Sequence, residues 1–160
     1  MNLYRDKGFT LLELVIVVLV IALVLAVAYP SLSRGSNALR LRATSRDIFN
    51  TFRYAREKAV TEQVRMMVTV DRQKQELTLT DILGGGGRKY YLPKDVRIER
   101  MAMSGAEVLE GPMVVHFLPN GSSDNAEILL KSDAGSVLRI ISDPITGGTR
   151  IVSGQGEDQP

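Results

Sequence analysis

The chain has 160 residues, of which 44% are hydrophobic and 24% are charged, and its formal net charge is +2. This length accommodates one domain with an appendage, and the balanced charge neither demands a polyanionic partner nor predicts disorder. Cysteine is absent, which excludes disulfide frameworks and thiolate zinc sites and gives no information on the redox compartment.

The first predicted element is an apolar helix near the amino terminus. From Phe9 to Tyr29 the only charged residue is Glu13. A helix of this length, about 31 Å, can cross a hydrocarbon core of about 30 Å. A carboxylate in that environment costs roughly 2.5–3.5 kcal/mol by insertion scales, so Glu13 is a candidate functional residue.

Three interpretations of this segment compete. A cleaved secretory signal has a shorter apolar run and no early carboxylate, and a plain signal anchor leaves Glu13 unexplained. The third interpretation makes Met1–Gly8 a leader that is cut after Gly8, which exposes the amine of Phe9. That ammonium could pair with Glu13 of the same chain or of a neighbour, and pairing between neighbours would set the stagger of packed helices.

The residues from Lys7 to Pro30, KGFTLLELVIVVLVIALVLAVAYP, resemble the signal and transmembrane helix of type IV pilins and type II secretion pseudopilins. In that family a prepilin peptidase cuts after the glycine and methylates the new amino terminus. The resemblance implies that residues 1–8 are a cleaved leader and that residues 9–30 are a transmembrane helix in which Pro30 can introduce a kink. It also implies that Phe9 becomes N-methylphenylalanine and that Glu13 serves assembly.

The positive charges near the apolar segment oppose the topology of that family. Arg5 and Lys7 precede the segment, whereas four arginines follow it within residues 34–46. The count alone places the carboxy-terminal part in the cytoplasm. The processing motif implies a short cytoplasmic leader instead. Because this motif is more specific than the charge count, we expect the carboxy-terminal domain in the periplasm.

Residues 31–63 predict a helical stem with one apolar face. Residues on that face recur at helical spacing; they are Leu41, Ile48, Phe52, Ala55 and Ala59. Arginines lie largely off this stripe: Arg40, Arg42, Arg46, Arg53 and Arg56. Acidic residues dilute them and no aromatic residues interleave, which is atypical of nucleic-acid surfaces. We therefore expect a solvated face, or one that meets acidic neighbours in a filament.

Residues 64–153 predict a β-rich globular domain. Two-residue alternation over Val64–Val70 and Leu77–Thr80 predicts a hairpin. Further strands are expected at Lys89–Leu92, Val96–Met101, Met113–Leu118, Glu127–Lys131, Val137–Ser142 and Arg150–Val152. The run Gly84–Gly87 lacks the lysine and hydroxyl of a P-loop and predicts a flexible turn, and residues 154–160 predict a loose tail.

Two carboxy-terminal stretches, VVHFLPNGSSDNAEILL and SVLRIISDPITGGTRIVSG, resemble the H-type minor pseudopilin (GspH/FimT-like) domain. That domain typically has a Phe-x-Pro-x-Gly turn and a closing Thr-Gly-x-x-Arg hairpin, which match Phe117, Pro119, Gly121, Thr146, Gly147 and Arg150. The resemblance implies an α+β, pilin-like fold, with a long amino-terminal transmembrane and stem helix packed on a small antiparallel β-sandwich. The lack of a cysteine pair and of a tryptophan-containing calcium loop favours a minor pseudopilin.

No catalytic or metal site is expected. His116 is the sole histidine, and alternation places it on the strand face opposite Val115 and Phe117, as a surface residue. Asp124, Glu127 and Asp133 lack the spacing of an EF-hand, so we expect solvation or turn capping.

The leading hypothesis is a structural subunit with no enzymatic activity and no cofactor: a minor pseudopilin of the type II protein secretion system, added near the tip of the periplasmic pseudopilus. It would cross the cell inner membrane once. Its expected partners are the prepilin peptidase/methyltransferase, the major and other minor pseudopilins and the inner-membrane assembly platform, but not nucleic acid. The alternative is a FimT-like minor type IV pilin that binds DNA during uptake, with Arg150, Arg139 and Lys131 as the contacts.

Overall fold

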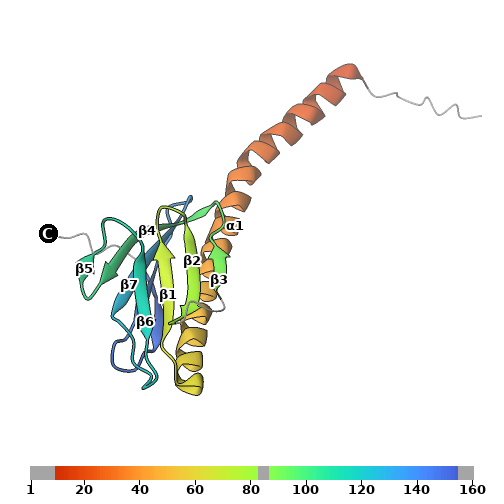
Figure 1. The fold of residues 1–160 in the computed structure, drawn as a ribbon. Helices are drawn as coiled ribbons and strands as arrows, with labels where there is room; N and C mark the ends of the chain where they lie inside the picture. The colour runs from red at the N-terminus through yellow and green to blue at the C-terminus, as the bar shows by residue number, and fades with distance from the viewer. Residues whose placement is uncertain (1–9, 83–86, 155–160) are drawn as a thin grey trace, which may run out of the picture. The chain divides into compact units, whose positions relative to one another are not determined.

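A computed structural model describes residues 10–82 and 87–154, except for the side chains of residues 26–36. In this part of the chain one helix, α1 (Leu11–Glu62), precedes nine strands (Figure 1). The residues form two compact units, Met1–Ser36 and Asn37–Pro160.

The described part of the first unit is the beginning of α1. The predicted leader, residues 1–8, and Phe9 lie outside the described residues. The end of the predicted transmembrane helix, including Pro30 and its expected kink, lies among the residues whose side chains are not described. Within the described residues, no helix is both long and apolar enough to cross a membrane.

In the second unit, α1 packs through the predicted apolar stripe. Leu41, Ile48, Phe52, Ala55 and Ala59 are all buried, which confirms the helical spacing found in the sequence. The helix ends at Glu62, and Gln63 follows with a φ of 55°. A residue in this left-handed conformation commonly ends a helix.

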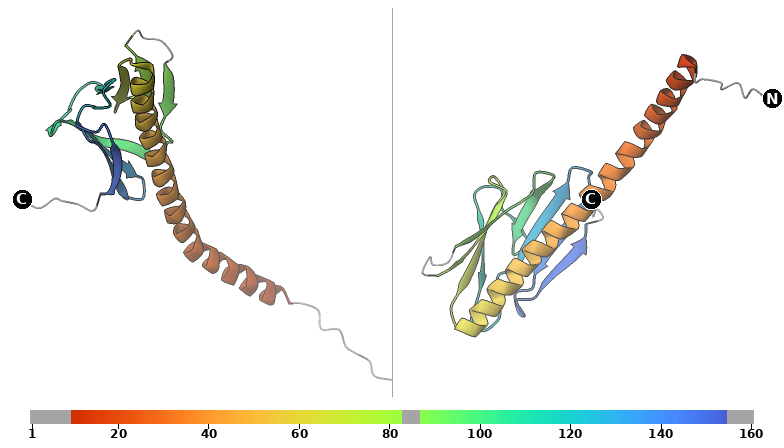
Figure 2. Two further views of the ribbon diagram at one scale, coloured as in Figure 1. Left: turned by 90° about the horizontal axis from the view of Figure 1, so that it is seen from below. Right: turned by 90° about the vertical axis from the view of Figure 1, so that its right-hand side faces the viewer.

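The strands form two antiparallel sheets, seen from two further directions in Figure 2. The first sheet has the order β3-β2-β1-β6, and its strands are β1 (Met66–Asp71), β2 (Glu76–Asp81), β3 (Arg88–Tyr91) and β6 (Met113–Phe117). The second has the order β5-β4-β7-β8-β9, and its strands are β4 (Val96–Met103), β5 (Ala106–Glu107), β7 (Ala126–Ser132), β8 (Val137–Ser142) and β9 (Thr149–Ser153).

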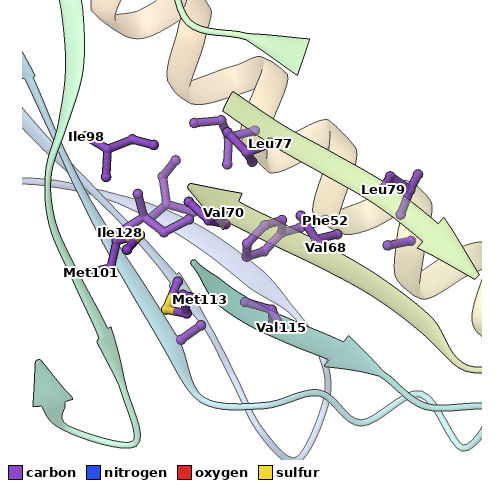
Figure 3. Close-up of a cluster of buried hydrophobic side chains, with 14 of the residues drawn as sticks. Phe52, Val68, Val70, Leu77, Leu79, Ile98, Met101, Met113, Val115 and Ile128 are labelled. Carbon is purple, nitrogen blue, oxygen red and sulfur yellow. The ribbon is translucent and has the colours of Figure 1, made fainter. Parts of the chain in front are cut away.

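One hydrophobic core joins the helix and both sheets (Figure 3). Alternate residues of β1, β6 and β7 are buried, as expected for strands with one face on a core. The ring of Phe52 on α1 meets Phe117 of β6 edge to face, with centroids 5.4 Å apart. The α+β, pilin-like fold predicted from the sequence is thereby confirmed.

The structure differs from the predicted strands in detail. β5 was not predicted, because a two-residue strand carries no alternation. β1 begins at Met66 rather than Val64, and β4 extends to Met103. Most of the glycine run, residues 84–86, and residues 155–160 of the predicted tail lie outside the described residues.

Candidate functional site

The amino-terminal part of α1 has an apolar surface on all sides. The large hydrophobic side chains from Leu11 to Leu25 are between 48% and 82% exposed. A helix that is apolar all round is stable only when lipid or other helices cover it. Within the described residues no other side chain provides that cover.

Glu13 lies in the first turn of this helix, and Thr10 caps it. The backbone N–H of Glu13 donates to the Thr10 hydroxyl at 3.2 Å, and that of Leu14 donates to the Thr10 carbonyl at 3.3 Å. The Thr-x-x-Glu spacing is that of a capping box, a signal that our sequence analysis missed. A carboxylate in the first turn also faces the positive end of the helix dipole. Glu13 therefore has a role within its own helix besides any role between subunits.

In the second unit, Arg56 joins the two motifs that carried the family resemblance. Its Nε donates to the carbonyl of Gly121 at 3.1 Å and to that of Thr146 at 2.8 Å. We expected Arg56 on a solvated or filament-facing side of the helix, and this expectation is wrong. The guanidinium is instead half-buried and holds the Phe-x-Pro-x-Gly turn against the closing hairpin.

Close approach of two backbone segments requires the glycine at position 147. Gly147 has a φ of 62°, and a Cβ built on it would lie 2.2 Å from the carbonyl oxygen of Gly121. No side chain fits in that space, and an L-residue is strained at that φ. The match to the family motif at Gly147 therefore has a packing cause, whereas at Gly121 the φ of 85° is what favours glycine.

Asp143 fixes the turn that carries Thr146. Its Oδ1 accepts the backbone N–H groups of Ile145 at 3.0 Å and Thr146 at 2.8 Å, and the Thr146 hydroxyl at 3.0 Å. These bonds, chiefly the one from the Thr146 backbone, hold the pKa of Asp143 below its ordinary value of 3.8.

His116 and Asp124 form a pair at the outer edge of β6. The His116 Nδ1 lies 2.7 Å from Asp124 Oδ2, which also accepts the His116 backbone N–H at 2.9 Å. Among the described residues no hydroxyl hydrogen-bonds to His116, so no nucleophile completes a triad. No group of three or more metal-ligating side chains occurs in the same residues. Asp124 thus binds the backbone and the side chain of one strand residue, whereas the sequence predicted solvation or turn capping.

The three candidate nucleic-acid contacts lie on the outer face of the second sheet, but two of them are ion-paired. Lys131 Nζ lies 3.0 Å from Glu99 and Arg139 Nε lies 3.2 Å from Glu127. The bond from Lys131 is the main cause that lowers the pKa of Glu99. Arg150 is exposed. The structure thus brings the three cations to one face without forming a patch free of carboxylates.

Comparison with known proteins finds a match to one sequence motif and a similar fold among solved structures. Residues 3–29 match the prokaryotic N-terminal methylation motif, which confirms the resemblance drawn from Lys7–Pro30. No curated protein matches the sequence significantly.

The fold is similar to that of the minor pseudopilin EpsH from the type II secretion system of Vibrio cholerae. Two structures of EpsH match with a TM-score of 0.60 each, at 12% and 13% identity, and each alignment covers 74% of this chain. The alignments cover 99% and 97% of the EpsH chains. At these identities the likeness establishes the fold, and the chain combines this fold with the methylation motif.

Proposed function

We propose that the chain is a minor pseudopilin, a structural subunit of a type II secretion system anchored in the inner membrane with its head in the periplasm. The observation that carries this proposal is the combination of an amino-terminal segment and a globular head in one chain. A methylation motif leads into a helix that is apolar on all sides, and a pseudopilin-type head follows it. The proposed mechanism is assembly and not turnover.

The proposed steps follow from the motif. A prepilin peptidase cuts between Gly8 and Phe9 and methylates the Phe9 amine. The exposed apolar helix then packs laterally against the helices of other pseudopilins near the tip of the filament. Glu13 pairs with an amine at the end of a neighbouring helix, which sets the stagger, since a carboxylate in an apolar environment is costly unless paired.

Substitution of Glu13 tests this function. In the organism that encodes the chain, Glu13→Val is expected to leave membrane insertion intact and to abolish pseudopilus assembly and secretion. Glu13→Asp retains the charge and should retain part of the activity. Thr10→Val is the matched control, since it removes the helix cap but leaves the carboxylate in place. Normal secretion with Glu13→Val would contradict the proposal. Mass spectrometry of the mature chain should find N-methylated Phe9 at its amino terminus.

The alternative function, DNA binding by a FimT-like minor pilin, rests on one observation. Lys131, Arg139 and Arg150 share one face of the second sheet, as the strand register shows. Two of these cations are already paired with carboxylates, which is why we favour the secretion subunit. DNA retardation that weakens steeply with added salt, and that is lost in Arg150→Ala, would support the alternative.

A further inference from the structure

β9 is an open edge of the second sheet. Its only neighbour in the described chain is β8, and the strand lies at the border of the sheet in the right-hand view of Figure 2. An edge strand presents unpaired backbone groups that can pair with another chain.

The direction of those groups follows from the flanking hydrogen bonds. Asp143 N–H donates to the Gly148 carbonyl at 2.7 Å, and Gly154 N–H donates to the Val137 carbonyl at 3.2 Å. Bonded pairs alternate along an antiparallel ladder, so the N–H and C=O groups of Arg150 and Val152 face β8. Those of the intervening residues, Thr149, Ile151 and Ser153, face away from the sheet.

The other edges of the two sheets are short or already hydrogen-bonded. At the border opposite β9, the outer strand is β5, which has only two residues and pairs with the end of β4. On β4, the side-chain amide of Gln75 replaces a neighbouring strand: its Oε1 accepts the Ile98 N–H at 2.7 Å, and its Nε2 lies 3.5 Å from the Ile98 carbonyl. On β6, Asp124 accepts the His116 N–H and returns its own N–H to the His116 carbonyl at 3.1 Å.

The remaining edge, β3, is protected in another way. It is only four residues long and begins with Arg88 and Lys89. Short length and charge are two devices by which proteins keep edges from pairing. β9 is longer and has apolar residues on both of its faces, with Ile151 36% and Val152 41% exposed.

The surroundings of β9 define the side chains that an added strand would carry. On the inner face Ile151 is paired in register with the buried Ile140, so the residue beside it should be apolar. On the outer face five cations face three carboxylates, which leaves net positive charge: the cations are Arg97, Arg100, Lys131, Arg139 and Arg150, and the carboxylates are Glu99, Glu127 and Asp143, which interacts with Arg150. Residues that point outward should therefore be acidic.

A cavity beside the start of β9 offers room for a further side chain. Its volume is about 460 Å³, and its lining includes Pro144, Thr146 and Arg150. The adjacent Ile145 is 84% exposed, which gives this end of the strand an uncovered apolar group.

We infer that β9 is a docking edge that accepts an extended strand, with alternating apolar and acidic residues, from the head of a neighbouring subunit. The choice of a subunit as the source rests on the proposed function. Strand addition provides affinity through main-chain hydrogen bonds, and alternate side chains provide specificity. Thr149, Ile151 and Ser153 supply the main-chain groups, and the cationic outer face selects the acidic side chains.

The absence of cysteine allows a direct test in the full chain. Ser153→Cys introduces the only thiol, which is labelled in cell membranes with a maleimide benzophenone and photolysed. The expected product is an adduct with another subunit, mapped by mass spectrometry to a segment of alternating apolar and acidic residues. Tyr91→Cys, a position on the protected edge β3 that is also exposed, is the matched control and should give no such adduct.

Two substitutions in the Ser153→Cys chain refine this test. Ile151→Pro removes an outward N–H that β8 does not use, and the adduct should fall roughly fivefold, the effect of losing one hydrogen bond. Hydrogen exchange of the β8 amides reports whether the head remains folded. Arg150→Glu, which alters no main-chain group, should also reduce the adduct because it opposes an acidic strand.

The inference is overturned if both labelled cysteines give equal adducts, if neither substitution changes the yield, or if the adduct joins two copies of this chain. Secretion that requires Glu13 but shows no adduct at Ser153 would overturn the docking edge alone. Secretion that does not require Glu13 would overturn the proposed function.

Discussion

Two parts of the helix α1 have the same backbone geometry but differ in whether their apolar side chains are buried. Between Leu11 and Leu25 every large hydrophobic side chain is exposed. Between Asn37 and Glu62 one stripe of apolar residues, from Leu41 to Ala59, is buried in the core shared with the sheets, and Leu39, Tyr54 and Val60 lie off this stripe and are exposed. Burial of an amphipathic face is what normally stabilises a helix within a protein. The second part therefore obtains its stability from packing within its own unit, whereas no described side chain covers the first part.

The largest effect that would test this comparison is expected from truncation of Phe52. Phe52→Ala removes a fully buried ring that packs on Phe117, and should destabilise the head by about 3–5 kcal/mol. Leu19→Ala, in the exposed part of the same helix, should leave head stability unchanged. Both are measured by hydrogen exchange of the β1 and β7 amides in the full chain. Equal effects of the two substitutions would show that the two parts do not differ as described.

A smaller loss of stability is expected at the contact between the Phe-x-Pro-x-Gly turn and the closing Thr-Gly-x-x-Arg hairpin. Gly147→Ala places a methyl group against the Gly121 carbonyl at a left-handed φ, and should cost about 2–4 kcal/mol from strain and overpacking together. Gly135→Ala is the matched control: its φ is 84° but nothing lies within 4 Å, so about 1 kcal/mol of backbone strain is expected. Equal losses would remove close packing as the reason for Gly147.

The smallest effect concerns the pH dependence of the head. Because the pKa of folded Asp143 lies below its ordinary value of 3.8, this carboxylate stabilises the fold above that value. The contribution is lost as the pH falls through the lower, folded pKa. Asp143→Asn should therefore lose less stability than the unmodified chain as the pH falls through 3.8 and below. Hydrogen exchange of the β8 amides at matched intrinsic rates measures the difference. Identical acid profiles would show that Asp143 does not contribute in this way.

The sequence predicted the elements whose signals are local. The stripe from Leu41 to Ala59 and the alternation in β1 appear in the structure as expected. The spacing of apolar residues along the chain is enough to decide which face of a helix or strand is buried. The helix cap at Thr10 also has a local signal in the sequence, the Thr-x-x-Glu pattern. It was not predicted, because Glu13 was interpreted only as a carboxylate within an apolar helix.

The sequence did not predict the contacts that depend on the tertiary fold. Arg56 lies 65 residues from Gly121 and 90 from Thr146, and nothing in its neighbourhood distinguishes it from the other arginines of the helix. Gln75 lies 23 residues from Ile98, and its role appears only when the two sheets are brought together. The pairing of Lys131 and Arg139 with carboxylates likewise depends on strand register.

The side chain of Gln75 has a consequence for the number of partners that the second sheet can have. Gln75 occupies the position of a neighbouring strand on β4, so this border of the sheet offers no backbone groups at Ile98 for further pairing. The rest of this border is the two-residue strand β5, which pairs with Ala102 and Met103 of β4. Each open border of a sheet can accept one strand directly from a partner. Among the described strands of this sheet, β9 is then the one edge long enough to pair with a partner along several residues, so strand addition would be monovalent.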